Sequence, residues 1–289
     1  MRIEDGRQSE NVEDRRGERA GGRLPIGGRG IGIGTVVLLL VAMYFGVDPS
    51  VILNQVSGPG PAAVEQAPPA SKPPAEDQLA KFVSVVLADT EDTWHEMFKR
   101  AGKQYQEPKL VLYTDAIGSA CGLGQAAMGP FYCPADQKVY IDLGFYRDLK
   151  ERFSAPGDFA QAYVIAHEIG HHVQNLLGIS DKVRQLQSRS TEVQGNQLSV
   201  MLELQADCLA GIWAHHANRT RHILEAGDVE EALGAATAIG DDRLQKQARG
   251  HVTPESFTHG SSQQRVRWFK RGIEGGELKQ CDTFAARQL

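Results

Sequence analysis

The feature that most constrains this chain is the stretch Val164–His172, which reads Val-Ile-Ala-His-Glu-Ile-Gly-His-His. It contains the pattern His-Glu-x-x-His, and the apolar residues ahead of the pattern favour a helix. On a helix, His167 and His171 are four residues apart, so they lie on one face, one turn apart. Two imidazoles in this arrangement can bind one Zn²⁺ ion. Glu168 lies about 100° around the helix, where its carboxylate reaches a water molecule beside the metal but not the metal itself.

A catalytic zinc site needs a third protein ligand as well as water. The metzincin class has a third His six residues after the second, but Leu177 stands at that position, which excludes this class. The stretch Glu203-Leu-Gln-Ala-Asp207 places two carboxylates four residues apart in an apolar segment. Because a buried carboxylate is costly unless it is paired or binds a metal, we predict that Glu203 binds zinc and that Asp207 accepts a hydrogen bond from a ligand imidazole. The alternative is a solvated helix face that carries a Glu and an Asp.

The predicted chemistry is hydrolysis of peptide bonds in a peptide or protein substrate, with one Zn²⁺ as cofactor. Glu168 would take a proton from the attacking water and pass it to the leaving amine. A second group must stabilise the developing oxyanion, and His259, just before a predicted helix, is the candidate. An ordinary loop His is the alternative. Two other functions share this site: an inactive, zinc-stabilised binding or scaffold protein of the cell envelope, and an amidase acting on cell-wall peptides.

Composition and charge separate the chain into segments. The net charge of −5 over 289 residues argues against nucleic acid as a partner. Residues 1–30 are rich in Arg, acidic residues and Gly, which predicts a disordered tail. Residues 54–76 are rich in Pro and Ala and predict an extended linker. The folded domain is then expected to occupy residues 77–289.

Residues 31–53 are predicted to form a transmembrane signal anchor. The segment 31–47 carries no charge, Arg residues precede it, and no Lys or Arg follows it until Lys72. The positive-inside rule then places residues 1–30 in the cytoplasm and the domain outside, anchored to the inner (cytoplasmic) membrane by a single pass. A buried segment of a soluble domain and a cleaved signal peptide are the alternatives.

The chain has four Cys. An even number in an exported domain permits two disulfides, with three possible pairings. Cys121 and Cys133 flank a Gly-rich stretch and are the favoured pair, which leaves Cys208 with Cys281. Four reduced thiols would be expected if the domain were cytosolic.

Hydrophobic periodicity predicts more helix than strand, so the expected fold is an α+β domain that is mainly helical, with a small β-sheet. Strands are predicted over 109–114 and 138–143, and the Gly-rich segment 117–130 is predicted to be a loop. Helices are predicted over residues 77–101, 145–153, 159–177, 180–188, 192–217, 228–248 and 262–273.

Five blocks together resemble the bacterial neutral zinc metallopeptidase family. The resemblance covers roughly residues 76–285 and implies a zincin-like, membrane-anchored zinc peptidase. The blocks are Cys121-Gly122, Gly129–Pro134, Val139–Leu143, Tyr163–Gln174 and Glu203–Trp213.

A more distant likeness extends to the prenyl-protein and HtpX-type membrane metallopeptidases. Their Glu-x-x-Ala-Asp supplies a third zinc ligand of the gluzincin type, which supports that role for Glu203. Thr258-His259 ahead of Arg265 is similar to their Thr-His-Pro…Arg segment, whose His contacts the reaction intermediate, although this chain has Gly260 in place of Pro. In zincins generally an edge strand pairs with extended substrate, and Val139–Leu143 is the candidate here.

Overall fold

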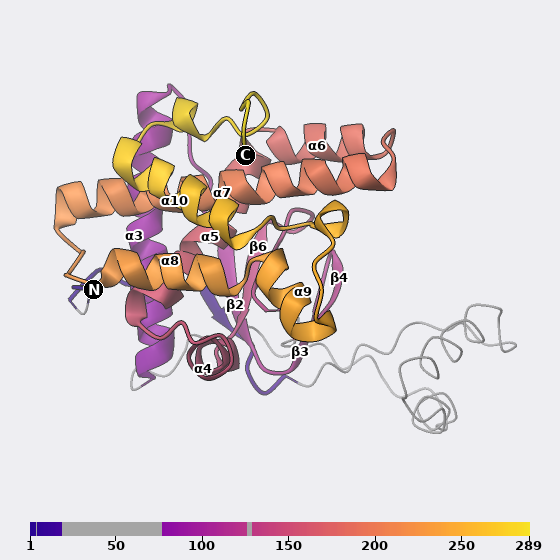
Figure 1. Cartoon of the computed structure of the whole chain (residues 1–289). Helices are drawn as coiled ribbons and strands as arrows, with labels where there is room; N and C mark the ends of the chain where they lie inside the picture. Colours follow the sequence, from indigo (N-terminus) through magenta and orange to yellow (C-terminus); the bar gives the residue numbers. More distant parts are fainter. Residues whose placement is uncertain (4, 19–76, 126–128) are drawn as a thin grey trace, which may run out of the picture. The chain divides into compact units, whose positions relative to one another are not determined.

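The structure, a computed structural model, describes residues 1–3, 5–18, 77–125 and 129–289 (Figure 1). Helices make up most of these residues and a small sheet accompanies them, which confirms the predicted α+β class. The α-helices are α3 (Gln78–Arg100), α4 (Gly144–Glu151), α5 (Asp158–Leu176), α6 (Ile179–Gln187), α7 (Glu192–Arg221), α8 (Asp228–Ala238), α9 (Asp241–Arg249) and α10 (Ser262–Gly275), and 3₁₀ turns are η2 (Pro254–Ser256) and η3 (Leu278–Cys281).

The sheet has four strands in the order β1-β2-β6-β5, and a separate hairpin pairs β3 with β4. Strands β1, β2 and β6 run parallel, whereas β5 is antiparallel to β6. The strands are β1 (Val12–Asp14), β2 (Lys109–Tyr113), β3 (Ala116–Ser119), β4 (Gly122–Gln125), β5 (Phe131–Cys133) and β6 (Lys138–Asp142).

Strand β6 is not an edge strand, so the prediction that Val139–Leu143 receives the substrate is wrong. The strand pairs with β2 along Lys138–Asp142 on one side and with β5 at Lys138–Tyr140 on the other. The sequence signal was ambiguous because a strongly apolar strand can lie at the centre or at the edge of a sheet. Among the described strands, β5 is the edge strand at this end of the sheet, opposite β1.

The two faces of the sheet pack against different partners. Alternate residues of β2 and β6, such as Leu112 and Ile141, join the main core with the helices. The intervening residues Val111 and Tyr140 join a second cluster with Ile117 of the β3–β4 hairpin. Period-two alternation therefore buries both faces, and the hairpin covers the side that the helices leave open.

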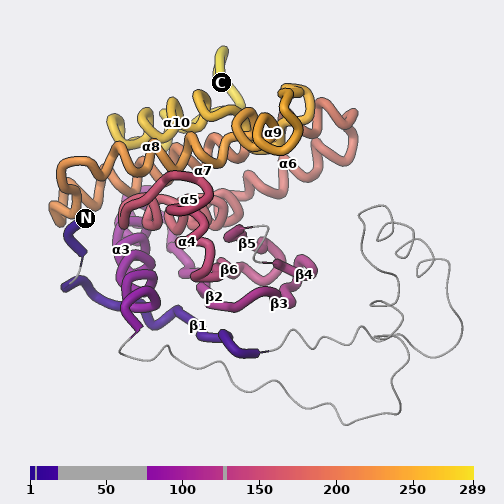
Figure 2. The backbone as a smooth tube through the Cα atoms, turned by 60° about the horizontal axis from the view of Figure 1, so that its bottom comes forward, coloured from indigo at the N-terminus to yellow at the C-terminus, as the bar shows by residue number. Residues whose placement is uncertain are grey.

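Helix α5 occupies the centre of the molecule and is buried along most of its length. It contacts α3, α7 and α8 as well as strands β5 and β6. Figure 2 shows α7, α8 and α10 in a layer above α5, and it shows the sheet below α5. A helix buried on all sides needs apolar residues all round, which explains why the segment before the His-Glu pattern is so apolar.

The N-terminal residues belong to the fold, so the predicted disordered tail is wrong for residues 1–3 and 5–18. Val12 lies opposite Leu110 in the β1–β2 pair, and Met1, Ile3 and Val12 are buried. The amino group of Met1 lies 2.6 Å from the Asp158 carboxylate at the start of α5. Three buried apolar residues among many charges give too weak a hydrophobic pattern for sequence analysis to detect.

This pairing also corrects the predicted topology. Strands β1 and β2 share backbone hydrogen bonds, so residues 12–14 and 109–113 lie on the same side of any membrane. A single crossing between residues 18 and 77 would separate them, and the predicted cytoplasmic tail with a single pass is therefore wrong. The predicted anchor at 31–53 and linker at 54–76 lie outside the described residues. No helix in the described ranges combines the length and the apolar character of a membrane span.

Two further elements differ from prediction. The predicted loop over 117–130 contains the β3–β4 hairpin, whose Gly124 packs directly against Phe131 and has no room for a side chain. The predicted helix over 228–248 is two helices, α8 and α9, because the backbone turns to an extended conformation at Gly240. The other predicted helices are confirmed to within a few residues at their ends.

Candidate metal centre

The site forms where helices α5 and α7 cross closely. A Cβ atom at Gly170 would lie 2.9 Å from the carbonyl oxygen of Ala206, which is closer than real Cβ atoms approach. Glycine at this position therefore allows the two backbones to touch. The contact brings one face of α7 against the face of α5 that carries the two His residues.

Glu203 lies between the two imidazoles, as the sequence predicted. Its Oε2 is 3.1 Å from Nε2 of His167, and its Oε1 is 3.4 Å from Nε2 of His171. The three donor atoms lie within 4.8 Å of one another. Tetrahedral zinc with bonds of about 2.1 Å separates its ligand atoms by roughly 3.4 Å, so the residues of this donor set and their spacing suit a zinc ion.

The opposite nitrogens of both imidazoles are already engaged. His167 Nδ1 donates to Asp207 Oδ1 at 2.9 Å, and His171 Nδ1 donates to Gln174 Oε1 at 2.9 Å. Gln174 in turn donates to the carbonyl oxygen of Leu202 at 2.7 Å. These bonds leave each Nε2 as the metal-facing atom. The predicted contact of Asp207 is present, whereas Gln174 was missed, although its position one helical turn after His171 was a usable signal.

Asp207 is the centre of a fully buried polar network. Arg265 forms a bidentate pair with its two oxygens, both at 2.9 Å, and the hydroxyl of Tyr163 also donates to it. Although burial opposes ionisation, Arg265 and His167 lower the pKa of Asp207 to about 2. The carboxylate is therefore charged at all physiological pH values and fixes the His167 ring orientation.

The electrostatics of the site favour a cation between the two helices. Although burial acts in the opposite direction, Asp207 and Glu203 raise the pKa of His167 to about 10. Likewise, despite burial, the two imidazoles lower the pKa of Glu203 well below its usual range. Two ionised carboxylates around two imidazoles stabilise added positive charge, which a proton or a metal ion can supply.

Glu168 lies beside the donor set on α5 and is only 7% exposed. Burial raises the pKa of its carboxyl group. A carboxylate with a raised pKa, next to the position of a hydrolytic water, has the properties of a general base.

His259 lines the same cleft and is held by a residue that sequence analysis missed. Its Nδ1 lies 3.3 Å from Oδ1 of Asp241, and the other oxygen of Asp241 accepts backbone N–H groups of Thr258, His259 and Gly260. The hydrogen bond with Asp241 raises the pKa of His259 against the effect of burial. Asp241 begins α9, and His259 follows 18 residues later, beyond that helix and the η2 turn, so no spacing rule links the two.

The cleft over these residues has a volume of about 740 Å³ and is mostly apolar. Phe131 and Tyr132 of the edge strand β5 form one wall, and α5, α6, α7 and the loop at His259 form the other. A volume of this size accommodates several side chains of an extended peptide.

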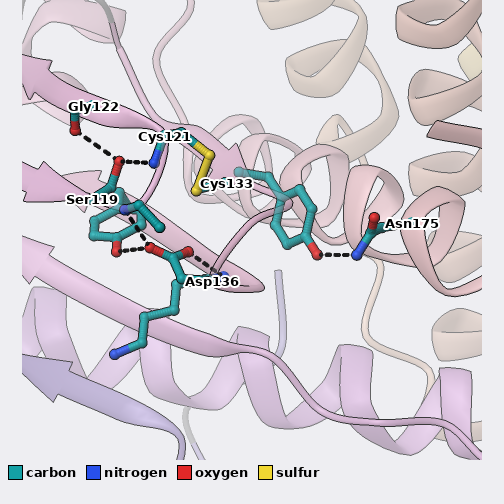
Figure 3. Close-up of a disulfide and its surroundings, with 10 residues drawn as sticks. Ser119, Cys121, Gly122, Cys133, Asp136 and Asn175 are labelled. Carbon is teal, nitrogen blue, oxygen red and sulfur yellow. Dashed lines mark hydrogen bonds between the residues drawn. A yellow bond between two sulfur atoms is a disulfide. The ribbon is translucent and has the colours of Figure 1, made fainter. Parts of the chain in front are cut away.

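Both predicted disulfides are present. Cys121–Cys133 joins the β3–β4 turn to the end of β5 (Figure 3), and Cys208–Cys281 joins α7 to η3 in the interior. In the first pair Cys121 is exposed and Cys133 is fully buried. In the second pair both residues are buried.

Comparisons with known proteins identify the family. The profile of the family described as "Putative neutral zinc metallopeptidase" matches residues 1–284. The chain is similar to the uncharacterized protein YpfJ of Escherichia coli K12, with 54% identity over 98% of this chain and 99% of that protein. It is also similar to the uncharacterized protein Rv2575 of Mycobacterium tuberculosis H37Rv, with 38% identity over 86% of each chain. No solved structure matches. The chain belongs to this zinc metallopeptidase family.

Proposed function

We propose that this member of the neutral zinc metallopeptidase family hydrolyses peptide bonds of extended polypeptides at one zinc ion held by His167, His171 and Glu203. The observation that carries the proposal is the convergence of these three groups from α5 and α7, with both Nδ1 atoms bonded away from the centre. A zinc ion held there would supply Lewis-acid polarisation of the peptide carbonyl and would lower the pKa of water.

The side chains of the chain itself then perform the proton transfers. Glu168 accepts a proton from the attacking water and delivers it to the leaving amine. The imidazolium form of His259 donates from Nε2 to the oxyanion, because its Nδ1 proton is directed at Asp241. Asp207 and Arg265 keep His167 in one tautomer and orientation.

The edge strand β5 is the proposed docking strand for substrate. It lines the cleft, and among the described strands it pairs with β6 alone. An extended peptide can add to such an edge by backbone hydrogen bonds, with its side chains alternating between the cleft and solvent. This arrangement makes unfolded or loop segments, which can adopt an extended conformation, the proposed substrate class.

We also propose an extracytoplasmic location, with residues 31–53 attached to the membrane from that side and without a net crossing. The two disulfides support it, because such bonds persist in oxidising compartments. Residues 1–18 would share that side with the rest of the domain, because β1 pairs with β2. Protease accessibility of tags at both termini in spheroplasts tests this: both tags should be cleaved from outside, and protection of one tag alone would contradict it.

Cleavage of a peptide library by the purified full chain tests the peptidase proposal. Wild type should lose activity on chelation and recover it with zinc. Glu168→Gln should retain zinc and lose activity by about 10²–10⁴-fold, because only the proton-transfer group is removed. A Glu168→Gln protein as active as wild type would refute the mechanism, and a zinc-loaded wild type that cleaves nothing would favour a binding role.

A further inference from the structure

The side chain of Tyr132 ties the edge strand β5 to the helix that carries the His pair. Along β5, Phe131 and Cys133 face the β3–β4 hairpin, so Tyr132 faces the opposite side, toward α5. Its hydroxyl oxygen lies 2.9 Å from His172 Nδ1 and 3.1 Å from Asn175 Nδ2. The bond to Asn175 is drawn in Figure 3.

The direction of each hydrogen bond follows from its partners. His172 Nε2 lies 2.6 Å from the carbonyl oxygen of Gln106, which only accepts, so Nε2 carries the hydrogen. In the neutral ring Nδ1 is then an acceptor, and the Tyr132 hydroxyl donates to it. The same hydroxyl accepts from the Asn175 amide. Every polar atom that meets in this clamp, defined as Tyr132, His172 and Asn175, therefore has a complementary partner.

The clamp is centred on a buried residue, His172, whereas Tyr132 and Asn175 are half-buried. His172 is 0% exposed, and the rings of Tyr105 and Tyr132 meet it edge-on at centroid distances of 5.7 and 5.4 Å. Breaking the bond from the Tyr132 hydroxyl would leave the buried Nδ1 of His172 unpaired, which favours the observed arrangement.

The position of the clamp relates the strand to the metal centre. His172 directly follows His171, and Asn175 lies one turn further along α5. The neighbouring residues of β5 are tied to the other side: Cys133 by its disulfide to Cys121, and Phe131 by stacking on Tyr140 at 4.8 Å. The Tyr132 hydroxyl provides the hydrogen bonds that hold β5 to α5 near the His pair.

We propose that Tyr132 is a positioning residue that sets the distance and register of the substrate-docking strand β5 relative to the metal-binding helix α5. The proposal rests on the proposed function, in which extended peptides add to β5. Loss of the hydroxyl would weaken the placement of a long peptide over the centre. It would not alter the donor set, because the hydroxyl contacts none of His167, His171 and Glu203.

Tyr132→Phe in the full chain tests this, with Tyr140→Phe as the matched control. Tyr140 lies on the adjacent strand and donates its hydroxyl to Asp136 at 2.8 Å, so the control removes one hydroxyl bond without touching α5. Substrates are a peptide of about eight residues, roughly 26 Å when extended, and a peptide too short to reach along β5. Zinc content and amide hydrogen exchange of residues 131–133 are measured in parallel.

Tyr132→Phe is expected to raise KM for the long peptide about tenfold, equivalent to about 1.4 kcal/mol. The kcat for both peptides, KM for the short peptide and zinc content should stay within about twofold of wild type, while the amides of β5 exchange about tenfold faster. Tyr140→Phe should change none of the kinetic values.

Unchanged KM and exchange in Tyr132→Phe would overturn the proposal. So would equal losses in Tyr132→Phe and Tyr140→Phe, because they would indicate general weakening of the sheet. A wild-type protein that binds zinc and cleaves nothing would overturn the proposed function instead. In that case, hydrogen exchange would still decide whether the Tyr132 hydroxyl holds β5 to α5.

Discussion

The two walls of the cleft are built by different means. The helical wall, formed by α5, α6, α7 and the loop at His259, is held by buried ionised groups centred on Asp207. The strand wall, β5, is held by neutral hydrogen bonds and by a disulfide that is partly exposed. Charged groups that bind a metal ion or transfer protons need a fixed environment that excludes water. A docking strand needs an edge that is open to substrate. Substitutions in the helical wall should therefore change chemistry, and those in the strand wall should change substrate binding.

After Glu168→Gln, the largest loss of activity in this comparison is expected from His259→Ala. Removing one oxyanion donor should lower kcat about 10²–10³-fold with little change in zinc content. Because Asp241 raises the pKa of His259, the donor form persists above the ordinary histidine value of about 6.5 and is lost as pH rises further.

The pH profile of kcat/KM distinguishes His259 as a donor from His259 as a structural residue. Wild-type activity should fall on the alkaline side as the imidazolium loses its proton. This alkaline limb should be absent in His259→Ala. A variant with reduced activity and an unchanged alkaline limb would show that another group titrates there.

Asp207→Asn should have a smaller effect, on metal affinity. The neutral amide cannot balance the positive charge of Arg265, and it does not raise the basicity of His167 as a carboxylate does. Zinc affinity should therefore fall about 10–100-fold. Competition with a chelator measures the affinity. Thermal unfolding of the metal-free variant separates this effect from a folding defect, since an unpaired Arg265 is itself destabilising. Unchanged zinc affinity would contradict the role of Asp207.

The smallest losses of activity in this comparison are expected when one of the two disulfides is removed. Replacing Cys121 and Cys133 by Ser opens a loop with a separation of 12 residues, for which loop entropy predicts about 3 kcal/mol of lost stability. Replacing Cys208 and Cys281 opens a separation of 73, for which about 4.5 kcal/mol is predicted.

The kinetic consequences should differ between the two disulfides. At a temperature where both variants are folded, loss of the first should raise KM for long peptides by a few-fold, because β5 loses one of its ties. Loss of the second should leave kinetics at the wild-type level. Denaturant titration with parallel kinetics measures both, and equal kinetic effects would mean that the strand wall has no special role.

Sequence analysis predicted the helical wall well because its signals are local or chemically costly. The His-Glu pattern fixes three residues by helix geometry. Two carboxylates in the apolar part of α7 are costly to bury unless a cation or a hydrogen-bond donor pairs with them. Gln174 and Asp241 were missed because single polar residues near a helix end or start are common and mostly serve as solvent contacts or caps.

The strand wall and the N-terminal strand were predicted poorly because pairing is non-local. Nothing in residues 138–143 distinguishes a central strand from an edge strand. Strand β1 has three residues, and β5 also has three. Such short strands are specified by their partners rather than by their own hydrophobic pattern. For β5, the disulfide at Cys133 helps to fix the position of the strand.

Zinc binding by Glu203→Ala tests the central claim most directly, since the claim is that α7 completes a centre begun on α5. Glu192→Ala, at the exposed start of the same helix, is the control. The wild type and the control should each bind one equivalent of zinc with equal affinity. Glu203→Ala should bind zinc at least about 100-fold more weakly. Zinc bound by Glu203→Ala with wild-type stoichiometry and affinity would contradict the claim.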